Sequence, residues 1–467
     1  MGDIAYRSRS GRAVLVATIL GSGVAFLDGT VVNVALPHMA RSFNAGFATM
    51  QWVLDSYLLM LGAFVLVGGA VGDVLGRRRV FLVGLIGFGV ASAACGAAPT
   101  GGLLVAARAV QGLAGALLVP GSLALIAASF TPDDRDRAIG TWSGLAGLAS
   151  ALGPFVGGWL VDAVSWRWVF YLNLPLITVA VVVTATAVPE SRDVAARGWR
   201  SLDLPGAGLV ALALGLLVVP LIETHLATAL RVGSFVASAL AAVAFARVEL
   251  TGRRPMVPLR LVRDRVFVVA NAITFVVYGA LGGALFLVAV QLQTGLGYSA
   301  LEAGAAMVPL TIALLLFSSR VGALLPRIGA RPLLTAGPVL AGGGLCLLAR
   351  ASPGASYAGG VLPGILVFSA GMCLVVAPIT STALGALDAA HAGLASGVNN
   401  AIARVASLLA VAVLPAVAGA GAGARLPQHG FQLAMLVAGV LAAAGGLMAY
   451  VGLPRIGGPP APGSVPA

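Results

Sequence analysis

The sequence predicts an all-α polytopic membrane protein, and three observations carry this prediction. Of the 467 residues, 59% are hydrophobic and only 9% are charged, whereas soluble domains carry about 25% charged residues. The mean hydropathy is +1.01. The apolar residues also form long runs, close to the ~20 residues that an α-helix needs to cross a ~30 Å hydrocarbon core. Because backbone polar groups within a bilayer must be satisfied internally, we expect these runs to be transmembrane helices.

Fourteen such runs follow one another along the chain, and short loops separate them. A basic segment precedes the first run, which is too long for the core of a signal peptide, so we expect it to be retained as the first span. A thirteen-span alternative would place a basic loop or the later arginines on the wrong side of the membrane. The expected spans are 13–36, 50–71, 80–98, 102–127, 138–161, 168–188, 204–222, 232–249, 267–291, 303–319, 332–349, 357–380, 395–423 and 430–453.

The positive charge of the chain is distributed unevenly between the loops. All 28 basic residues are arginines, and the net charge is +12. With the N-terminus inside, this asymmetry predicts fourteen spans with both termini in the cytoplasm, and no role in nucleic-acid binding. The absence of lysine excludes a Walker A loop, so an ATP-driven pump would need a second chain. The outer loops hold only Arg41, Arg167, Arg231, Arg350 and Arg425.

A charged loop between the second and third runs appears twice in the chain. Its pattern is G-x-x-x-D-x-x-G-R-R, in which one acid faces a basic cluster. A degenerate copy occupies 322–331, where Pro326 stands in the place of the acid. The copies fall at equivalent points of two six-span blocks, which indicates a duplicated protein. The first copy comprises Gly69, Asp73, Gly76, Arg77 and Arg78.

The spans therefore divide into six, two and six. Paired six-span halves with a site near the midplane are typical of secondary transporters. We expect the extra pair to serve packing, since its one candidate for a deep charge is Glu223 at the outer end. The expected units are an N-terminal six-helix bundle at 1–188, a linker with two additional helices at 189–266, a C-terminal six-helix bundle at 267–453, and a disordered cytoplasmic tail at 454–467.

Four further stretches occur in a fixed order in the first half: LDGTVVNVALP at 27–37, RAVQG at 108–112, GPFVGG at 153–158 and WRWVFYLNLP at 166–175. Together with the charged loop, they resemble the major facilitator superfamily and, within it, the fourteen-span drug:proton antiporters. Ala149 departs from the antiporter motif, which usually begins with Gly there. The resemblance is dense in the first half and rests mainly on topology beyond it. It implies a major facilitator fold in a bacterial inner membrane and proton-driven export.

Three ionisable residues are expected deep in the bilayer, where charge is costly and usually functional. Counting ~1.5 Å per residue from the helix ends places Asp28, Asp55 and Arg108 at one level in the outer third. We expect them to form one cluster that couples protons and binds substrate, because a cation can replace the proton on a buried acid. The alternatives are a structural hydrogen bond for Asp28, bulk water around Asp55, and outward snorkelling of Arg108.

The resemblance also implies roles for residues outside this cluster. The charged loop that contains Asp73 would control conformational switching, and its acid would meet the start of span 13 near 397–400. The antiporter motif would let span 5 bend and pack closely, and so block uncoupled leak. We expect Arg404 at the inner membrane boundary, since 405–424 alone is long enough to span. The antiporter-motif residues are Gly153, Pro154, Gly157 and Gly158.

The sequence favours a monomeric exporter of lipophilic cationic or neutral small molecules, without a cofactor or metal. A proton-symporting importer of a metabolite or nutrient is the nearest alternative, and the antiporter motif argues against it. A membrane-embedded enzyme or a receptor is a third possibility. Enzyme chemistry would need clustered histidines or a nucleophile with a base, but the chain has four histidines, none expected deep, and no HExxH motif.

Overall fold

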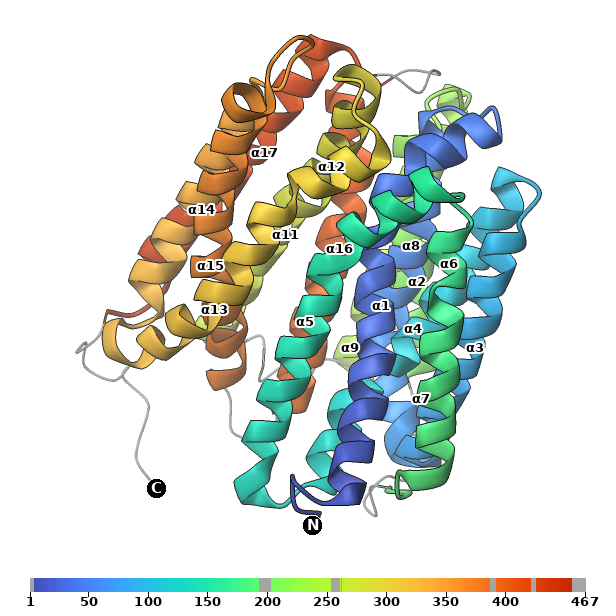
Figure 1. The fold of residues 1–467 in the computed structure, drawn as a ribbon, viewed down its shortest axis with the longest axis vertical. Coiled ribbons are helices and arrows are strands. Elements are labelled where there is room, and N and C mark those ends of the chain that lie inside the picture. The colour runs from blue at the N-terminus through green and yellow to red at the C-terminus, as the bar shows by residue number, and fades with distance from the viewer. Residues whose placement is uncertain are drawn as a thin grey trace.

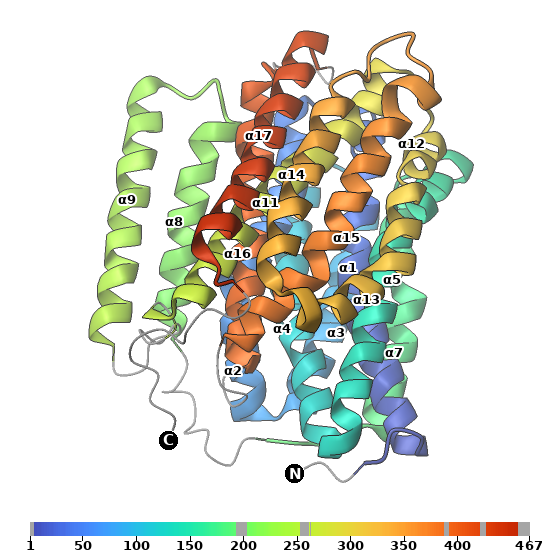
Figure 2. The same cartoon turned by 90° about the vertical axis from the view of Figure 1, so that its left-hand side faces the viewer.

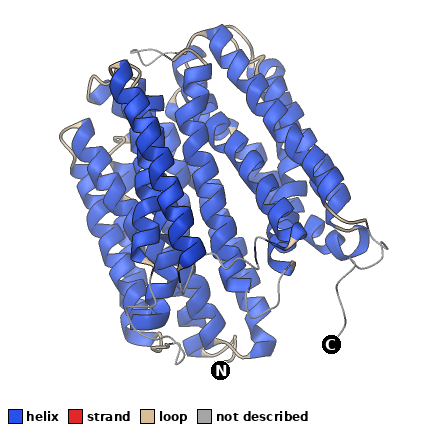
Figure 3. Cartoon of the chain, turned by 180° about the vertical axis from the view of Figure 1, so that it is seen from behind, coloured by secondary structure: helices blue, strands red, loops and turns tan. Residues whose placement is uncertain are grey.

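The computed structural model describes residues 4–192, 203–252, 261, 263–386, 392–420 and 426–455. Within these ranges the chain is helical, and one isolated bridge between Ile4 and Phe130 is the sole extended pairing (Figure 3). Fourteen helices are long and apolar enough to cross a membrane, which confirms the predicted number of spans. Parts of the predicted linker and basic loop, and almost all of the predicted tail, lie outside the described residues.

The chain forms two helical bundles and one additional helix pair (Figure 1). The N-terminal bundle consists of α1 (Arg9–Ser42), α2 (Phe47–Leu75), α3 (Arg77–Ala97), α4 (Gly101–Ser129), α5 (Pro132–Ala163), α6 (Trp168–Tyr171) and α7 (Asn173–Ala187). The additional pair is α8 (Leu204–Ile222) and α9 (Thr228–Thr251). The C-terminal bundle consists of α11 (Arg265–Val290), η2 (Gln291–Gly295), α12 (Ala300–Ala306), α13 (Val308–Ile328), α14 (Ala330–Leu348), η3 (Tyr357–Val361), α15 (Leu362–Gly385), α16 (Ala392–Val417) and α17 (Gln428–Gly452).

Several spans are broken within their length, and prolines account for part of this. The span that contains α12 and α13 changes direction at Met307, two residues before Pro309, which lacks the amide hydrogen for a helical bond. The sixth span is divided into α6 and α7 at Leu172, so α7 begins at Asn173. This division matters for the site, because it places a polar side chain at the start of a new helix.

Small residues let the helices within each bundle approach closely. A Cβ atom on Gly112 of α4 would lie 2.4 Å from the carbonyl oxygen of Tyr57 on α2. In the C-terminal bundle, a Cβ atom on Gly342 of α14 would lie 2.3 Å from the carbonyl oxygen of Gly439 on α17. In a membrane, where lipid is as apolar as the side chains, such close backbone packing is a main source of helix association.

The two bundles meet most extensively along α2 with α16 and α5 with α12, and α1 also contacts α11. At the end of α5 away from the N-terminus, a Cβ atom on Gly158 would lie 2.3 Å from the carbonyl oxygen of Ala300. The glycines in the first half of α5, Gly140, Gly144 and Gly147, have nothing within 4 Å of such an atom. The contact of α5 with the C-terminal bundle extends from Gly158 back to Ala151, whose carbonyl oxygen accepts a hydrogen bond from Thr311 Oγ1 on α13 at 2.8 Å.

The additional helices lie at the edge of the molecule (Figure 2). The helix α8 packs against α2, and the indole Nε1 of Trp52 donates a hydrogen bond to Glu223 Oε1 at 2.8 Å. The outer helix α9 packs against α8 and is largely exposed otherwise. Glu223 thus ties the additional pair to the N-terminal bundle and makes no contact with the buried charges described below.

Candidate functional site

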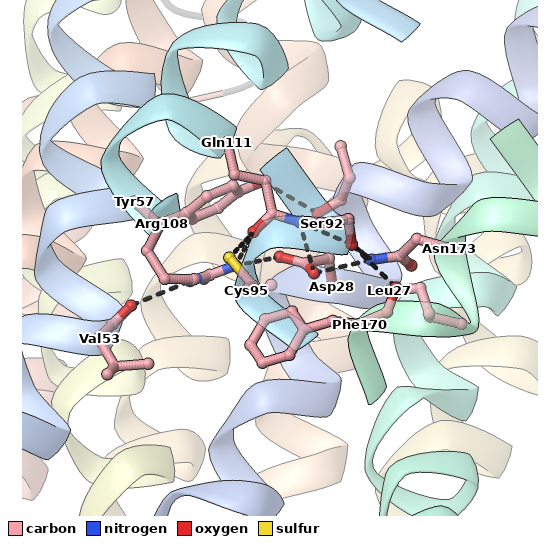
Figure 4. A network of polar contacts seen from close by, with 12 residues as sticks. Leu27, Asp28, Val53, Tyr57, Ser92, Cys95, Arg108, Gln111, Phe170 and Asn173 are labelled. Atoms are coloured by element: carbon pink, nitrogen blue, oxygen red, sulfur yellow. Dashed lines mark hydrogen bonds and ion pairs between the residues drawn. The ribbon is translucent and has the colours of Figure 1, made fainter. Parts of the chain in front are cut away.

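The centre of the N-terminal bundle contains a fully buried ion pair (Figure 4). Asp28 lies on α1 and Arg108 on α4, and neither side chain has any solvent-exposed surface. Arg108 Nη1 donates to Asp28 Oδ2, and Arg108 Nε donates to the carbonyl oxygen of Val53 at 3.0 Å. Burial removes the solvation of both charges, so the pair persists only because each charge satisfies the other.

A polar network completes the surroundings of the carboxylate. Asp28 Oδ1 accepts hydrogen bonds from Gln111 Nε2 and Asn173 Nδ2, both at 3.0 Å. Asn173 also donates to Ser92 Oγ at 2.9 Å, and the Ser92 hydroxyl donates to the carbonyl oxygen of Phe170 at 2.9 Å. The carboxylate therefore connects α1 with α4 and α7, and Ser92 adds α3 to the network through Asn173.

Local sequence explains how these side chains reach one point. Arg108 and Gln111 are three residues apart on α4, so they share a helix face, and Arg108 Nη1 also donates to Gln111 Oε1 at 2.8 Å. The division of the sixth span presents Asn173 at the start of α7. Aromatic rings cover the guanidinium, whose carbon is 4.2 Å from the centroid of the Tyr57 ring and 5.9 Å from that of Phe170.

Asp55 does not join this network. Its side chain is completely buried, which rules out the bulk-water alternative, and neither carboxylate oxygen has a hydrogen-bond partner among the described residues. One turn earlier on α2, Gln51 Nε2 donates to the carbonyl oxygen of Val411 on α16 at 2.9 Å. Asp28 and Arg108 are thus in contact as predicted, whereas Asp55 is a separate, unpartnered acid.

The charged loop has a different arrangement from the one that the resemblance implied. Asp73 pairs with Arg77 one turn later, with an N–O distance of 2.8 Å, rather than with the start of α16. Arg77 donates its backbone amide to the carbonyl of Ser191 at 2.9 Å, so the loop is held against the segment that follows α7. Gly69 lies on α2 against α4, where an added Cβ atom would be 3.4 Å from Pro120.

Glu190, which follows α7, organises the other side of this loop. Its Oε1 accepts the backbone amide of Arg78 at 3.1 Å, and its Oε2 lies 3.7 Å from Arg79 Nε. Arg78 also donates its side chain to the carbonyl oxygens of Thr184 and Ala185. Gly76 has φ +109°, and a Cβ atom there would lie 2.8 Å from the Glu190 carboxyl group. A glycine is therefore required at this turn by both conformation and space.

The antiporter-motif glycines hold α5 against two different helices. A Cβ atom on Gly153 would lie 2.1 Å from Thr30 Oγ1, and one on Gly157 would lie 2.4 Å from Val31 Cγ2, both on α1. Pro154 lies against α12, because a Cβ atom on Gly304 would be 2.1 Å from the Pro154 carbonyl oxygen. The motif thus forms a contact between the bundles beside the helix that carries Asp28.

Arg404 lies well inside α16, and the expectation that it sits at the inner membrane boundary is wrong. Its guanidinium carbon is 5.9 Å from the ring of Phe26, near the middle of α1. The error arose because the apolar residues after Arg404 are long enough to span by themselves. The structure begins the helix at Ala392, so the arginine is carried inside.

Sequence reasoning missed part of the network. Ser92 was not predicted as a site residue, and Gln111 and Asn173 appeared only within the quoted motifs RAVQG and WRWVFYLNLP, without a predicted role. A polar residue three positions after a buried arginine was an available signal for Gln111, but Ser92 and Asn173 come from other helices. Within the described residues, no group of three or more His, Cys, Asp or Glu side chains could hold a metal ion.

Comparison with known proteins places the chain in a family. The family model described as Major Facilitator Superfamily matches residues 18–411. The multidrug resistance protein Stp of Mycobacterium tuberculosis is 37% identical over 426 residues, which cover 90% of this chain and 78% of Stp. The puromycin resistance protein pur8 of Streptomyces alboniger is 36% identical over 440 residues, covering 91% of this chain and 86% of pur8.

A solved structure shows the same fold at much lower sequence identity. A POT family transporter in complex with a thioalcohol-conjugated peptide has a TM-score of 0.70 at 13% identity, covering 93% of this chain and 95% of that chain. The fourteen membrane-spanning helices, the family model and the relatives of similar length agree with one another. The chain is a multi-pass membrane protein that belongs to the major facilitator superfamily.

Proposed function

We propose that this protein is a proton-coupled secondary exporter of lipophilic small molecules such as drugs or antibiotics. The names of its relatives, a multidrug resistance protein and a puromycin resistance protein, support export rather than uptake. The observation that carries the proposal is the buried Asp28 carboxylate, which joins α1 to α4 and α7 directly and to α3 through Asn173 and Ser92. In this proposal the protein acts as a monomer in the bacterial cell membrane, with both termini in the cytoplasm and without a cofactor.

Asp28 is the proposed proton carrier. Its ionised form is held by Arg108, Gln111 and Asn173, all of which donate to it. Protonation would neutralise the carboxylate and leave Arg108 without a counter-charge in a buried position, which is costly. Binding and release of one proton would therefore change the relative stability of two arrangements of α1, α3, α4 and α7. This is the differential interaction that proton-driven switching requires.

The proposed substrate site lies between the bundles and includes Asp55, the second buried acid. Asp55 lies one helical turn after Gln51, which bonds to α16, and among the described residues its carboxylate has no partner that would compete with a positively charged group. A cationic or neutral lipophilic compound fits such a site. The glycines of the antiporter motif keep α5 in contact with α12, and the Asp73 loop would couple the switch to the cytoplasmic side.

The test measures proton movement directly. Purified protein is reconstituted into vesicles that contain a pH-sensitive dye, and proton release on adding rhodamine 123 or puromycin is recorded for the wild type and for Asp28→Asn. We expect the wild type to exchange protons for substrate and the Asp28→Asn variant to show none. Glu223→Gln is the matched control, because it also converts an acid to an amide but lies outside the network.

Equal proton exchange by the wild type and Asp28→Asn would move the coupling role away from Asp28. An absence of proton exchange in the wild type, combined with substrate movement that follows only its own gradient, would refute proton-coupled export as a whole. A cellular assay in an efflux-deficient host gives an independent readout. Expression should lower rhodamine 123 accumulation, and a protonophore should abolish this effect.

A further inference from the structure

Arg404 is the charged group in the middle of the described spans that the proposed mechanism leaves unexplained. Arg108 is neutralised by Asp28, but no ion pair or hydrogen bond of the Arg404 side chain occurs among the described residues. Its guanidinium carbon instead lies 5.9 Å from the centroid of the Phe26 ring. A guanidinium keeps its charge at any physiological pH, so this charge requires a partner from outside the described chain or from water.

The side chain of Arg404 lies where the two bundles meet. It leaves α16 directly opposite Gly62 of α2, where a Cβ atom on the glycine would be 3.3 Å from Arg404 Cβ. Its guanidinium then extends to Phe26 of α1. The helix α11 packs against α16 beside the arginine, where a Cβ atom on Gly279 would lie 3.5 Å from the carbonyl oxygen of Ala406. The Arg404 side chain therefore extends from the C-terminal bundle toward two helices of the N-terminal bundle, α1 and α2.

The backbone of α16 is fixed at this position on both sides of the arginine. One turn after it, Ser407 Oγ donates to the carbonyl oxygen of Tyr278 at 3.2 Å. Five residues before it, Asn399 Nδ2 donates to Asn271 Oδ1 at 3.1 Å and to Thr274 Oγ1 at 2.8 Å. These bonds to α11 hold the helix in register, so the direction of the Arg404 side chain is set by the fold.

Arg404 and the residues beside its guanidinium are partly exposed. Phe26 is partly exposed, and so is Gly29 one turn later on the same face of α1. A Cβ atom on Gly29 would have nothing within 4 Å. Asn33, one further turn along, is also partly exposed and bonds only to its own helix. The described residues therefore leave this face of α1 partly uncovered, and the Arg404 guanidinium from the opposite bundle lies beside it at Phe26.

Charge in the surroundings favours an anionic occupant. Asp28 is committed to Arg108, Gln111 and Asn173, and Asp55 forms no ion pair with Arg404. A guanidinium binds carboxylate or phenolate oxygens through paired, charge-assisted hydrogen bonds. A planar aromatic group can stack on the partly exposed ring of Phe26 beside it. An aromatic ligand that carries an acidic group would satisfy both features.

We infer that Arg404 is a substrate-binding residue that takes the carboxylate of an aromatic substrate between the bundles. This inference rests on the proposed export function and extends its substrate class. The sequence favoured cationic or neutral substrates because Asp28 and Asp55 were expected deep in the bilayer, whereas Arg404 was expected at its boundary. The position of Arg404 adds an anion-binding point on the second bundle, so acidic aromatic compounds belong to the substrate range.

The test uses two dyes with the same tricyclic core, fluorescein, which is anionic, and rhodamine 123, which is cationic. Equilibrium binding to the purified full-length protein is measured by fluorescence anisotropy. Arg404→Gln should weaken fluorescein binding at least tenfold and leave rhodamine 123 within twofold. Arg404→Lys, which keeps the charge, should retain most of the fluorescein affinity. Arg231→Gln at the exposed start of α9 is the matched control and should change neither.

A comparison on the ligand side requires no variant. Esterifying the fluorescein carboxylate removes the group that Arg404 would hold, so wild-type protein should bind fluorescein methyl ester at least tenfold more weakly. Equal affinity for the acid and the ester, no measurable fluorescein binding, or equal weakening of both dyes by Arg404→Gln would each overturn the inference. Proton-driven export of rhodamine 123 is scored separately, so its failure would count against the proposed function and not against the anion site.

Discussion

Replacing Asp28 with asparagine tests the structural and functional roles of the buried pair together. The change keeps the size of the side chain but removes its charge. Arg108 would then be a cation with no counter-charge, completely buried between α1, α2 and α4. The new amide group would also face three donors, from Arg108, Gln111 and Asn173, so at least one donor would meet another donor.

The size of the effect follows from the burial. Removing one partner of a buried ion pair costs about 3–5 kcal/mol, because it leaves an unpaired charge in a low-dielectric environment. The single variants Asp28→Asn and Arg108→Met should each lose about this much free energy of unfolding. The double variant removes both charges, so it should recover about 2–3 kcal/mol relative to the sum of the single losses. Its transport should nevertheless remain absent, since no titrating group is restored.

The free energy of unfolding is measured for the four proteins in mixed micelles by denaturant titration, and uphill export is measured in proteoliposomes with an imposed pH gradient. Strictly additive losses would show that the two charges are not coupled in the folded protein. Full uphill export by a stably folded Asp28→Asn variant would refute the assignment of Asp28 as the proton carrier. Recovery of export by the double variant would contradict it in the same way.

Three further variants test the loop and the antiporter motif. Gly157→Leu should abolish export while the protein remains inserted and monodisperse, because even a Cβ atom would lie 2.4 Å from Val31; normal export would show that this contact is dispensable. Asp73→Asn should change the free energy of unfolding by less than about 1 kcal/mol, since its pair with Arg77 is partly exposed. The variant should nevertheless stop net transport and leave substrate affinity largely intact. Lost affinity with intact exchange would contradict a switching role. Gly76→Ala should cost about 1–3 kcal/mol because of its positive φ, and an unchanged free energy of unfolding would refute that strain.

The sequence by itself determined the number of spans, their approximate limits and the fold class. Hydrophobic length, the distribution of arginine and repeated loops are local properties that a chain carries before it folds, so they can be read without contacts. The depth estimate also placed Asp28 and Arg108 at the same level, because helix rise is nearly constant. Their contact in the structure agrees with that estimate.

Only the tertiary structure decided which polar side chains meet. Depth along a helix says nothing about the direction in which a side chain points, and that direction depends on how each helix is rotated against its neighbours. Asp55 shares the estimated level with Asp28 but does not join its network, and Gln51, one turn earlier on α2, bonds to α16 instead. Asn173 joins the network because the sixth span breaks at Leu172, and Arg404 reaches α1 because Gly62 lets α16 lie close to α2. These outcomes depend on packing between distant segments, which no local pattern encodes.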